Sequence, residues 1–165
     1  MRLALLTDIH ANREALSAVL ADLRQRQVDR IVILGDIVGY GPDPGWCVDR
    51  VASLMDQGAL CVRGNHDQAI GTEDSALNVT ARRVINWTRP LLSDAQKTLL
   101  AALPMTARIE DLLFVHASAN APEDWIYVSS ETRALGSFRA SDARLIFCGH
   151  VHVPALMSYD MAGRV

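Results

Sequence analysis

Short apolar runs alternate with longer amphipathic segments over the first 65 residues of the chain. The apolar runs have the length of strands, and they span residues 2–6, 30–34 and 60–63. The segments between them carry apolar residues at helical spacing, and they span residues 12–27 and 42–57. Asn12 and Asp43 stand where each helix would begin, as helix-capping residues do. The pattern therefore predicts strand, helix, strand, helix, strand.

The polar residues that follow these strands recur at a regular interval. Asp8 and Asp36 are 28 residues apart, and Asp36 and Asn65 are 29 residues apart. A strand–helix–strand unit takes roughly 30 residues, and its right-handed crossover makes the two strands parallel. Parallel strands end at one edge of a sheet, where open α/β sheets bind their ligands. We therefore expect Asp8, His10, Asp36, Asn65 and His66 to converge at that edge.

The rest of the chain adds helices and a second group of strands. We expect helices over residues 78–89 and 93–103, a hairpin over 105–109 and 112–116, a loop over 119–130 and a strand over 145–148. A short strand ending at Tyr159 and a turn at Ala162-Gly163 follow in the prediction. Strands that alternate with helices in this way predict an α/β fold.

All five histidines of the chain lie at the ends of apolar runs. They occur in the strings TDIH, GNHD, LLFVH and GHVH, as His10, His66, His116, His150 and His152. A lone histidine is more often a structural residue. Neutral imidazoles grouped with carboxylates, however, are ligands that suit borderline divalent metals. No histidine is left over for an ordinary role, so we predict a metal site.

The candidate ligands are numerous enough to hold two metal ions. They are Asp8, His10, Asp36, Asn65, His116, His150 and His152. Two metals about 3.5–4 Å apart clamp the attacking and leaving oxygens of a phosphoryl transfer, and they acidify a water that they share. We expect Asp36, on the central strand of the three, to bridge them. Gly35, Gly64 and Gly149 each precede a ligand and would allow close backbone approach.

One histidine is expected to stay off the metals. His66 lies between Asn65 and Asp67, and we expect the Asp67 carboxylate to hold the His66 imidazole in its protonated form. The imidazolium would then donate to the leaving-group oxygen or to the phosphoryl oxygens. His66 and Asp67 are therefore the predicted catalytic residues.

Taken in order, these strings resemble the five motifs of the calcineurin-like metallophosphoesterase family. The motifs are Asp8-x-His10, Gly35-Asp36-x-x-Gly39, Gly64-Asn65-His66-Asp67, a lone His116 and Gly149-His150-x-His152, and they run from residue 7 to residue 152. The longer strings TDIHAN and LGDIVGYGP resemble a branch of small prokaryotic phosphodiesterases and phosphatases. The phosphate-binding arginine of the protein-phosphatase branch is missing, which argues against a protein substrate.

The resemblance implies a two-sheet α/β sandwich with flanking helices and a metal-dependent phosphoester hydrolase. One metal would be held by Asp8, His10, Asp36 and His152, and the other by Asp36, Asn65, His116 and His150. A hydroxide that bridges the metals would attack phosphorus, with His66, oriented by Asp67, as the acid or transition-state stabiliser. Manganese is the expected metal, and iron, cobalt, nickel and zinc are alternatives for this ligand set.

Members of the family continue beyond the last motif with further strands, whereas this sequence stops at Val165. We therefore expect residues 1–165 to form one metallophosphoesterase domain, with either a short second sheet or a C-terminal truncation that removes its last strands. An uncovered sheet edge would favour a homodimer.

Composition narrows the class of partner. Of the 165 residues 50% are hydrophobic and 21% are charged, and the formal net charge is -3, which is typical of a folded globular protein. No broad positive field would attract nucleic acid or an anionic membrane. A small-molecule phosphoester is the expected substrate, and the loops over residues 71–78 and 117–130 are expected to bind its leaving group.

The cysteines and the apolar runs indicate the compartment. Cys47, Cys61 and Cys148 follow no disulfide or metal-binding pattern, so we expect reduced, mostly buried thiols. No apolar run has the length of a signal peptide or a membrane span, and we expect a cytoplasmic protein.

Two alternatives stay open. The chain could be an inert binding or scaffold protein with the same fold, although the presence of both His66 and Asp67 argues against this. It could also be a nuclease that acts on DNA ends, against which the negative net charge and the lack of an evident basic stripe argue.

Overall fold

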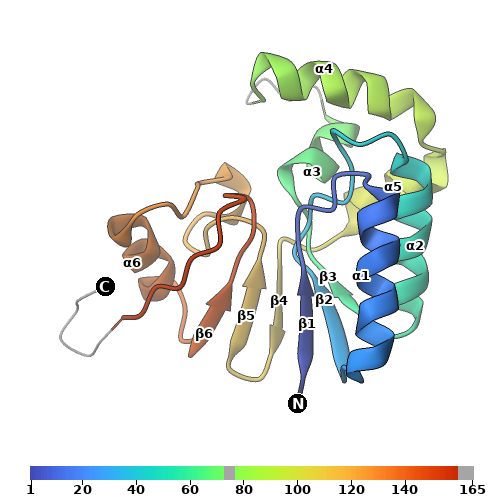
Figure 1. Cartoon of the computed structure of the whole chain (residues 1–165). Helices are drawn as coiled ribbons and strands as arrows, with labels where there is room; N and C mark the ends of the chain where they lie inside the picture. Colours follow the sequence, from blue (N-terminus) through green and yellow to red (C-terminus); the bar gives the residue numbers. More distant parts are fainter. Residues whose placement is uncertain (73–76, 160–165) are drawn as a thin grey trace.

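The computed structural model describes residues 1–72 and 77–159, and its first half is built on a parallel sheet. The sheet contains β1 (Leu3–Leu6), β2 (Arg30–Ile33) and β3 (Leu60–Cys61), in that order. The connecting helices α1 (Arg13–Arg26) and α2 (Pro44–Asp56) lie together on one face of it (Figure 1). The predicted order of strand, helix, strand, helix, strand is confirmed.

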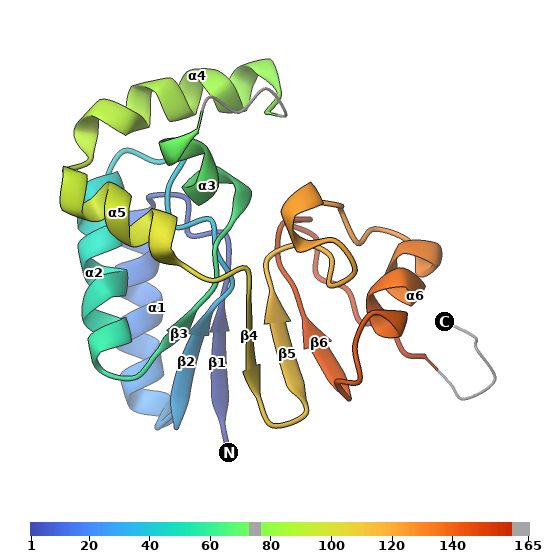
Figure 2. The same ribbon diagram turned by 180° about the vertical axis from the view of Figure 1, so that it is seen from behind.

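A second, mixed sheet contains β4 (Thr106–Ile109), β5 (Leu112–Val115) and β6 (Leu145–Phe147). β4 and β5 form the predicted antiparallel hairpin, and β6 pairs with β5 in parallel. In both views this sheet lies beside the first one, with α6 (Glu131–Arg139) beyond its outer side (Figures 1 and 2). The expected two-sheet α/β sandwich with flanking helices is confirmed.

The sandwich has two apolar clusters, one on each face of the first sheet. Ile33 packs toward the helices together with Leu16, Leu20 and Leu100. Its neighbours Val32 and Leu34 point the opposite way, toward Phe114 of the second sheet. Because β2 is buried on both faces, its sequence is a continuous apolar run rather than an alternating one.

The remaining helices surround the edge where the parallel strands end. They are α3 (Asn65–Gly71), α4 (Val79–Thr88), α5 (Asp94–Ala102) and the 3-10 turns η1 (Arg89–Leu91) and η2 (Pro122–Asp124). Asn12 caps α1 by accepting from the Ala15 N–H, as predicted. The predicted capping box at the start of α5 is also formed, between Ser93 and Gln96. α4 lies across this end of the molecule, above α3 (Figure 1).

Three elements differ from the sequence prediction. α3 and α6 were not predicted, because their short sequences carry no long apolar stripe. The short strand that was predicted to end at Tyr159 is wrong, since residues 151–159 contain no strand. The apolar side chain of Leu156 is 98% exposed there, and no neighbouring strand pairs with the backbone. The turn at Ala162-Gly163 lies outside the described residues.

The structure bears on two sequence features, the absence of a membrane-spanning run and the state of the cysteines. Within residues 1–72 and 77–159, no helix combines the length and apolar character that a bilayer crossing requires. All three cysteines are free, as expected; Cys47 and Cys61 are buried, whereas Cys148 is exposed.

Two leucines test the division between core and surface. Leu100 of α5 is fully buried, whereas Leu156 is almost fully exposed. We expect Leu100→Ala to lower the free energy of unfolding by about 2–5 kcal/mol, because it removes buried methyl groups and leaves a cavity. Leu156→Ala should change it by less than about 0.5 kcal/mol. Urea unfolding followed by circular dichroism measures both, and equal effects of the two substitutions would contradict this core.

Candidate metal centre

All the predicted ligands lie at one edge of the sandwich, directly after the strands. Asp8 and His10 follow β1, Asp36 follows β2, and Asn65 and His66 open α3 just after β3. The second sheet contributes His116 after β5 and the pair His150 and His152 after β6. The convergence that the spacing predicted is therefore formed, and it draws on both sheets.

The backbone is in the left-handed region at five of these residues. The φ angles are 52° at Asp8, 49° at His10, 53° at Asp36, 66° at His150 and 58° at His152. Non-glycine residues rarely adopt this conformation, and each instance costs of order 1–3 kcal/mol. Such strain clusters at functional sites, where the surrounding structure holds it in place.

One group of ligand atoms gathers around His152. Its Nε2 lies 3.1 Å from Asp8 Oδ1 and 3.2 Å from His10 Nε2. His10 Nε2 is also 3.7 Å from Asp36 Oδ2. The His152 side chain is 49% exposed, so this group opens toward the surface.

A second group gathers around His116, which is fully buried. Its Nε2 lies 3.1 Å from Asn65 Oδ1, 3.2 Å from His150 Nδ1 and 3.4 Å from Asp36 Oδ2. The same Asp36 oxygen therefore faces both groups. Asp8, His10 and His152 come close enough to hold one cation, and Asp36, His116 and His150 to hold another. A third combination joins His10 and Asp36 to His66.

The outer ring nitrogens show which way the lone pairs point. His10 Nδ1 faces the Val38 carbonyl oxygen at 3.2 Å, and His116 Nδ1 faces that of Leu34 at 2.6 Å. His150 Nε2 faces the Trp125 carbonyl oxygen at 2.9 Å. A carbonyl only accepts, so each of these nitrogens donates, and in the neutral ring the inner nitrogen carries a lone pair.

His116 Nε2 and His150 Nδ1 therefore face each other. When both rings are neutral, each of these two nitrogens carries a lone pair and neither carries a proton. A cation between them would satisfy both lone pairs, and orientation of a ring by an outer carbonyl is typical of metal-binding histidines. The donor set therefore fits a divalent metal.

The electrostatics of the centre favour positive charge. Burial alone would raise the pKa of Asp36, but the imidazoles of His116, His66 and His10 outweigh it and lower the pKa to about 2. Burial would lower the pKa of His116, but the Asp36 carboxylate outweighs it and raises the pKa to about 9. Burial, together with the charge on His116, lowers the pKa of His150. Asp36 would attract a bound cation in the same way.

The glycines beside the ligands are required by close contacts. A Cβ atom on Gly64 would overlap with the backbone nitrogen and the carboxylate of Asp36. A Cβ atom on Gly149 would overlap with the hydroxyl of Thr7 and approach the carboxylate of Asp8. Both glycines therefore let two strand ends come close enough to share ligands, as expected from the sequence.

The geometry around Asp67 differs from the expectation. Its Oδ1 accepts from the N–H groups of Ile37 and Val38, at 2.9 and 3.3 Å, and its Oδ2 accepts from the Gly64 N–H at 3.0 Å. Burial, and next the Asp36 charge, raise the pKa of Asp67 to about 7. Asp67 thus ties the loop after β2 to the start of α3, and it positions His66 through the backbone rather than through the ring.

The His66 ring is buried beside the ligands. Its backbone N–H donates to Asp36 Oδ1 at 2.9 Å, and its ring centroid is 5.0 Å from that of His10. Its Nδ1 is buried without a hydrogen-bond partner in the described structure. Burial lowers the pKa of His66, contrary to the expectation that Asp67 keeps it protonated.

Several contacts of the centre were not predicted. The ring of Tyr127 stacks on that of His150 at 4.0 Å, and the Thr7 hydroxyl donates to Asp8 Oδ2 at 2.6 Å. Trp125 contributes its carbonyl oxygen to His150. The loop over residues 117–130, which was expected to bind a leaving group, thus supports a ligand. Arg63, just before Gly64, donates to the Leu103 carbonyl at 2.7 Å.

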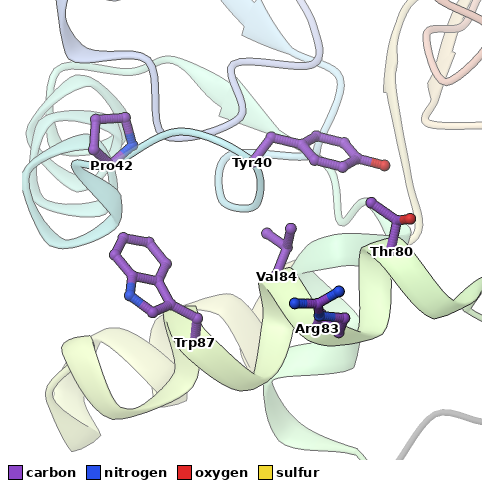
Figure 3. A pocket seen from close by; sticks show the side chains of 6 residues that line it. All are labelled: Tyr40, Pro42, Thr80, Arg83, Val84 and Trp87. Carbon is purple, nitrogen blue, oxygen red and sulfur yellow. The ribbon is translucent and has the colours of Figure 1, made fainter.

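A groove opens beside the centre. Its volume is about 480 Å³, and Figure 3 shows the loop after β2 on one side of it and α4 on the other. It is lined by Tyr40, Pro42, Thr80, Arg83, Val84 and Trp87. The Tyr40 ring lies 4.7 Å from the rings of both His10 and His66, so the groove begins at the ligands.

A family of known proteins and two individual proteins resemble this chain over most of its length. Residues 1–154 match the family described as calcineurin-like phosphoesterases. A Methanocaldococcus jannaschii protein, MJ0912, described as uncharacterized, is 35% identical over 164 residues, which are 96% of this chain and 65% of that protein. The crystal structure of a metallophosphoesterase from Sphaerobacter thermophilus is 41% identical, with a TM-score of 0.80 over 93% of this chain and 62% of that one.

The same fold occurs at lower identity. The crystal structure of a hypothetical protein from Pyrococcus horikoshii, PH1004, is 22% identical, with a TM-score of 0.81 over 98% of this chain and 73% of that one. This chain spans 65% and 62% of the length of the two relatives with higher identity.

Two glycines test the close approach at Asp36. Gly64→Ala should force the ends of β2 and β3 apart and lower the free energy of unfolding by about 1–3 kcal/mol, with weaker binding of Mn²⁺. Gly71→Ala is the matched control, because a Cβ atom there meets nothing within 4 Å. Urea unfolding and calorimetric Mn²⁺ titration measure both variants. Normal Mn²⁺ binding by Gly64→Ala would contradict the tight packing described here.

Proposed function

Because the chain belongs to the calcineurin-like phosphoesterase family, we propose that it hydrolyses small-molecule phosphoesters with the help of two divalent metal ions. The observation that carries this proposal is the pair of ligand groups that share Asp36 Oδ2, with imidazole lone pairs turned inward. Hydrolysis adds water across the P–O bond, so that phosphorus gains an oxygen and the leaving group gains a proton.

Each metal would have its own ligand set. We assign Asp8, His10, Asp36 and His152 to one ion, and Asp36, Asn65, His116 and His150 to the other. When bound, such ions activate a water molecule and neutralise charge on the phosphoryl oxygens. Mixed nitrogen and oxygen ligands suit Mn²⁺, our first choice, and also iron, cobalt, nickel or zinc.

His66 is the proposed proton donor to the leaving group. Its ring lies beside Tyr40 and His10 at the mouth of the groove. His10, Asp36 and His66 also come close enough together to hold an ion, and we assign His66 to neither metal. The pKa of His66 is lowered by burial, and an anionic phosphate beside the ring would raise it again. Asp67 supports this role by fixing the start of α3 through its hydrogen bonds to the backbone.

The substrate would enter where the centre is exposed. His152 is half-exposed, whereas Asp36 and His116 are buried beneath it. A small phosphoester can reach this side, and its organic part would extend along the groove beside Tyr40. A cytoplasmic location and a homodimer stay predictions from the sequence.

Turnover by two variants tests the assignment. The wild-type protein, stripped of metal and titrated with Mn²⁺, should hydrolyse bis-p-nitrophenyl phosphate or p-nitrophenyl phosphate. Asp36→Ala should lose both turnover and metal, because it removes the oxygen that both groups share. His66→Ala should keep two metals per chain and lose roughly 10²–10⁴-fold in kcat.

The metal content and the turnover rate of the wild type and of the two variants together decide between the possible roles of these residues. Loss of metal by His66→Ala would show that His66 is a ligand. Unchanged turnover by Asp36→Ala would overturn the shared-ligand assignment. A wild-type protein that binds two metals and hydrolyses neither ester would favour the binding-protein alternative.

A further inference from the structure

α4 carries a second stripe beside its buried face. The buried face is formed by Ala81, Ile85 and Thr88. Thr80, Arg83, Val84 and Trp87 follow the spacing i, i+3, i+4 and i+7, so they form one stripe along the helix next to that face. The Trp87 side chain in this stripe is 49% exposed. A solvated face would not be expected to carry a half-exposed tryptophan beside an arginine.

The stripe lines the groove beside the centre, and Thr80, Arg83 and Trp87 are exposed in it. Tyr40 and Pro42 stand across from it, and Figure 3 shows Thr80, Val84 and Trp87 rising from α4 toward the loop, with Arg83 on the near side of the helix. Tyr40 has a left-handed backbone, with φ of 61°, and its ring is half-exposed. Because the same ring contacts His10 and His66, the groove continues directly from the proposed proton donor.

We propose that this groove is the leaving-group subsite, and that it takes a leaving group with a planar ring and a second negative charge, as a nucleotide has. The inference rests on the proposed function. The indole of Trp87 and the phenol of Tyr40 offer faces on which a planar ring stacks. Arg83 offers a guanidinium for the second anion, and it has no ion-pair partner within residues 1–72 and 77–159.

The size and charge of the groove suit a leaving group with a planar ring and a second negative charge. A volume of about 480 Å³ lies within the range of pockets that hold small organic ligands. The phosphoryl group would lie at the ligands, the second anion near Arg83, and the ring near Trp87. Arg83 and Trp87 are one helical turn apart on the same stripe, which places the two contacts next to each other.

Calorimetric titration of the Mn²⁺-loaded protein with ribose 5-phosphate, AMP and ADP tests each contact. AMP should bind at least about 5-fold more tightly than ribose 5-phosphate, because only AMP carries a base to stack. Trp87→Ala should abolish this difference, and Trp87→Phe should restore much of it. ADP should bind about 10-fold more tightly than AMP, and Arg83→Gln should remove that advantage.

Controls keep the test decisive. Arg139→Gln removes the same charge from α6, far from the groove, and should leave all three affinities unchanged. Binding of inorganic phosphate should be the same in the wild type and in Trp87→Ala, which shows that the variant is folded. Equal binding of AMP and ribose 5-phosphate by the wild type would overturn the inference, even if bis-p-nitrophenyl phosphate is hydrolysed. Absence of that hydrolysis would instead overturn the proposed function.

Discussion

The buried charge of Asp36 is the constraint on which the rest of the site depends. Its side chain is almost completely inaccessible, and a carboxylate taken out of water costs several kcal/mol unless hydrogen bonds and positive charge compensate it. Oδ1 receives the His66 N–H, and Oδ2 faces imidazoles that come from β1 and from β5. The two sheets must therefore meet at this edge, because neither one alone supplies all of the compensating groups.

The strained backbone around Asp36 is part of the same arrangement. The left-handed residues after β1, β2 and β6 turn side chains inward that an extended chain would direct to opposite faces. The apolar packing on both sides of β2 supplies the rigidity that holds these conformations. A weakened core would therefore also disturb the positions of the ligands.

The features of the fold and the site that the sequence predicted are those that depend on local sequence pattern and on the spacing of motifs. The interval between Asp8, Asp36 and Asn65 predicted their convergence, since it equals one crossover unit. Ser93 predicted the start of α5 through its capping chemistry. The helix at Asn65 was missed because the motif there was interpreted only as a ligand loop, although the acidic Asp67 three residues after Gly64 was a usable signal.

Side-chain contacts between segments that are far apart in the chain could not be predicted from the sequence. The stacking of Tyr127 on His150 depends on how the loop after β5 folds back, which no periodicity describes. Asp67 was assigned to the His66 ring because the two are adjacent in the chain, whereas helical geometry turns its carboxylate toward the loop after β2. The predicted strand before Tyr159 was also wrong because it depended on a distant segment. A strand forms only where a neighbouring strand pairs with its backbone N–H and C=O groups.

The hydrogen bond from His116 to the Leu34 carbonyl joins the second sheet to the end of β2. The same ring presents its other nitrogen to the candidate ligands, so a single imidazole both fastens the sheets together and faces the metal position. Occupancy of that position and cohesion of the sandwich are therefore thermodynamically linked. A ligand that binds only the assembled edge, at a hundred times its dissociation constant, adds about 2.7 kcal/mol to the stability of the folded chain. Metal supply would then act on how long the protein survives as well as on the proposed hydrolysis.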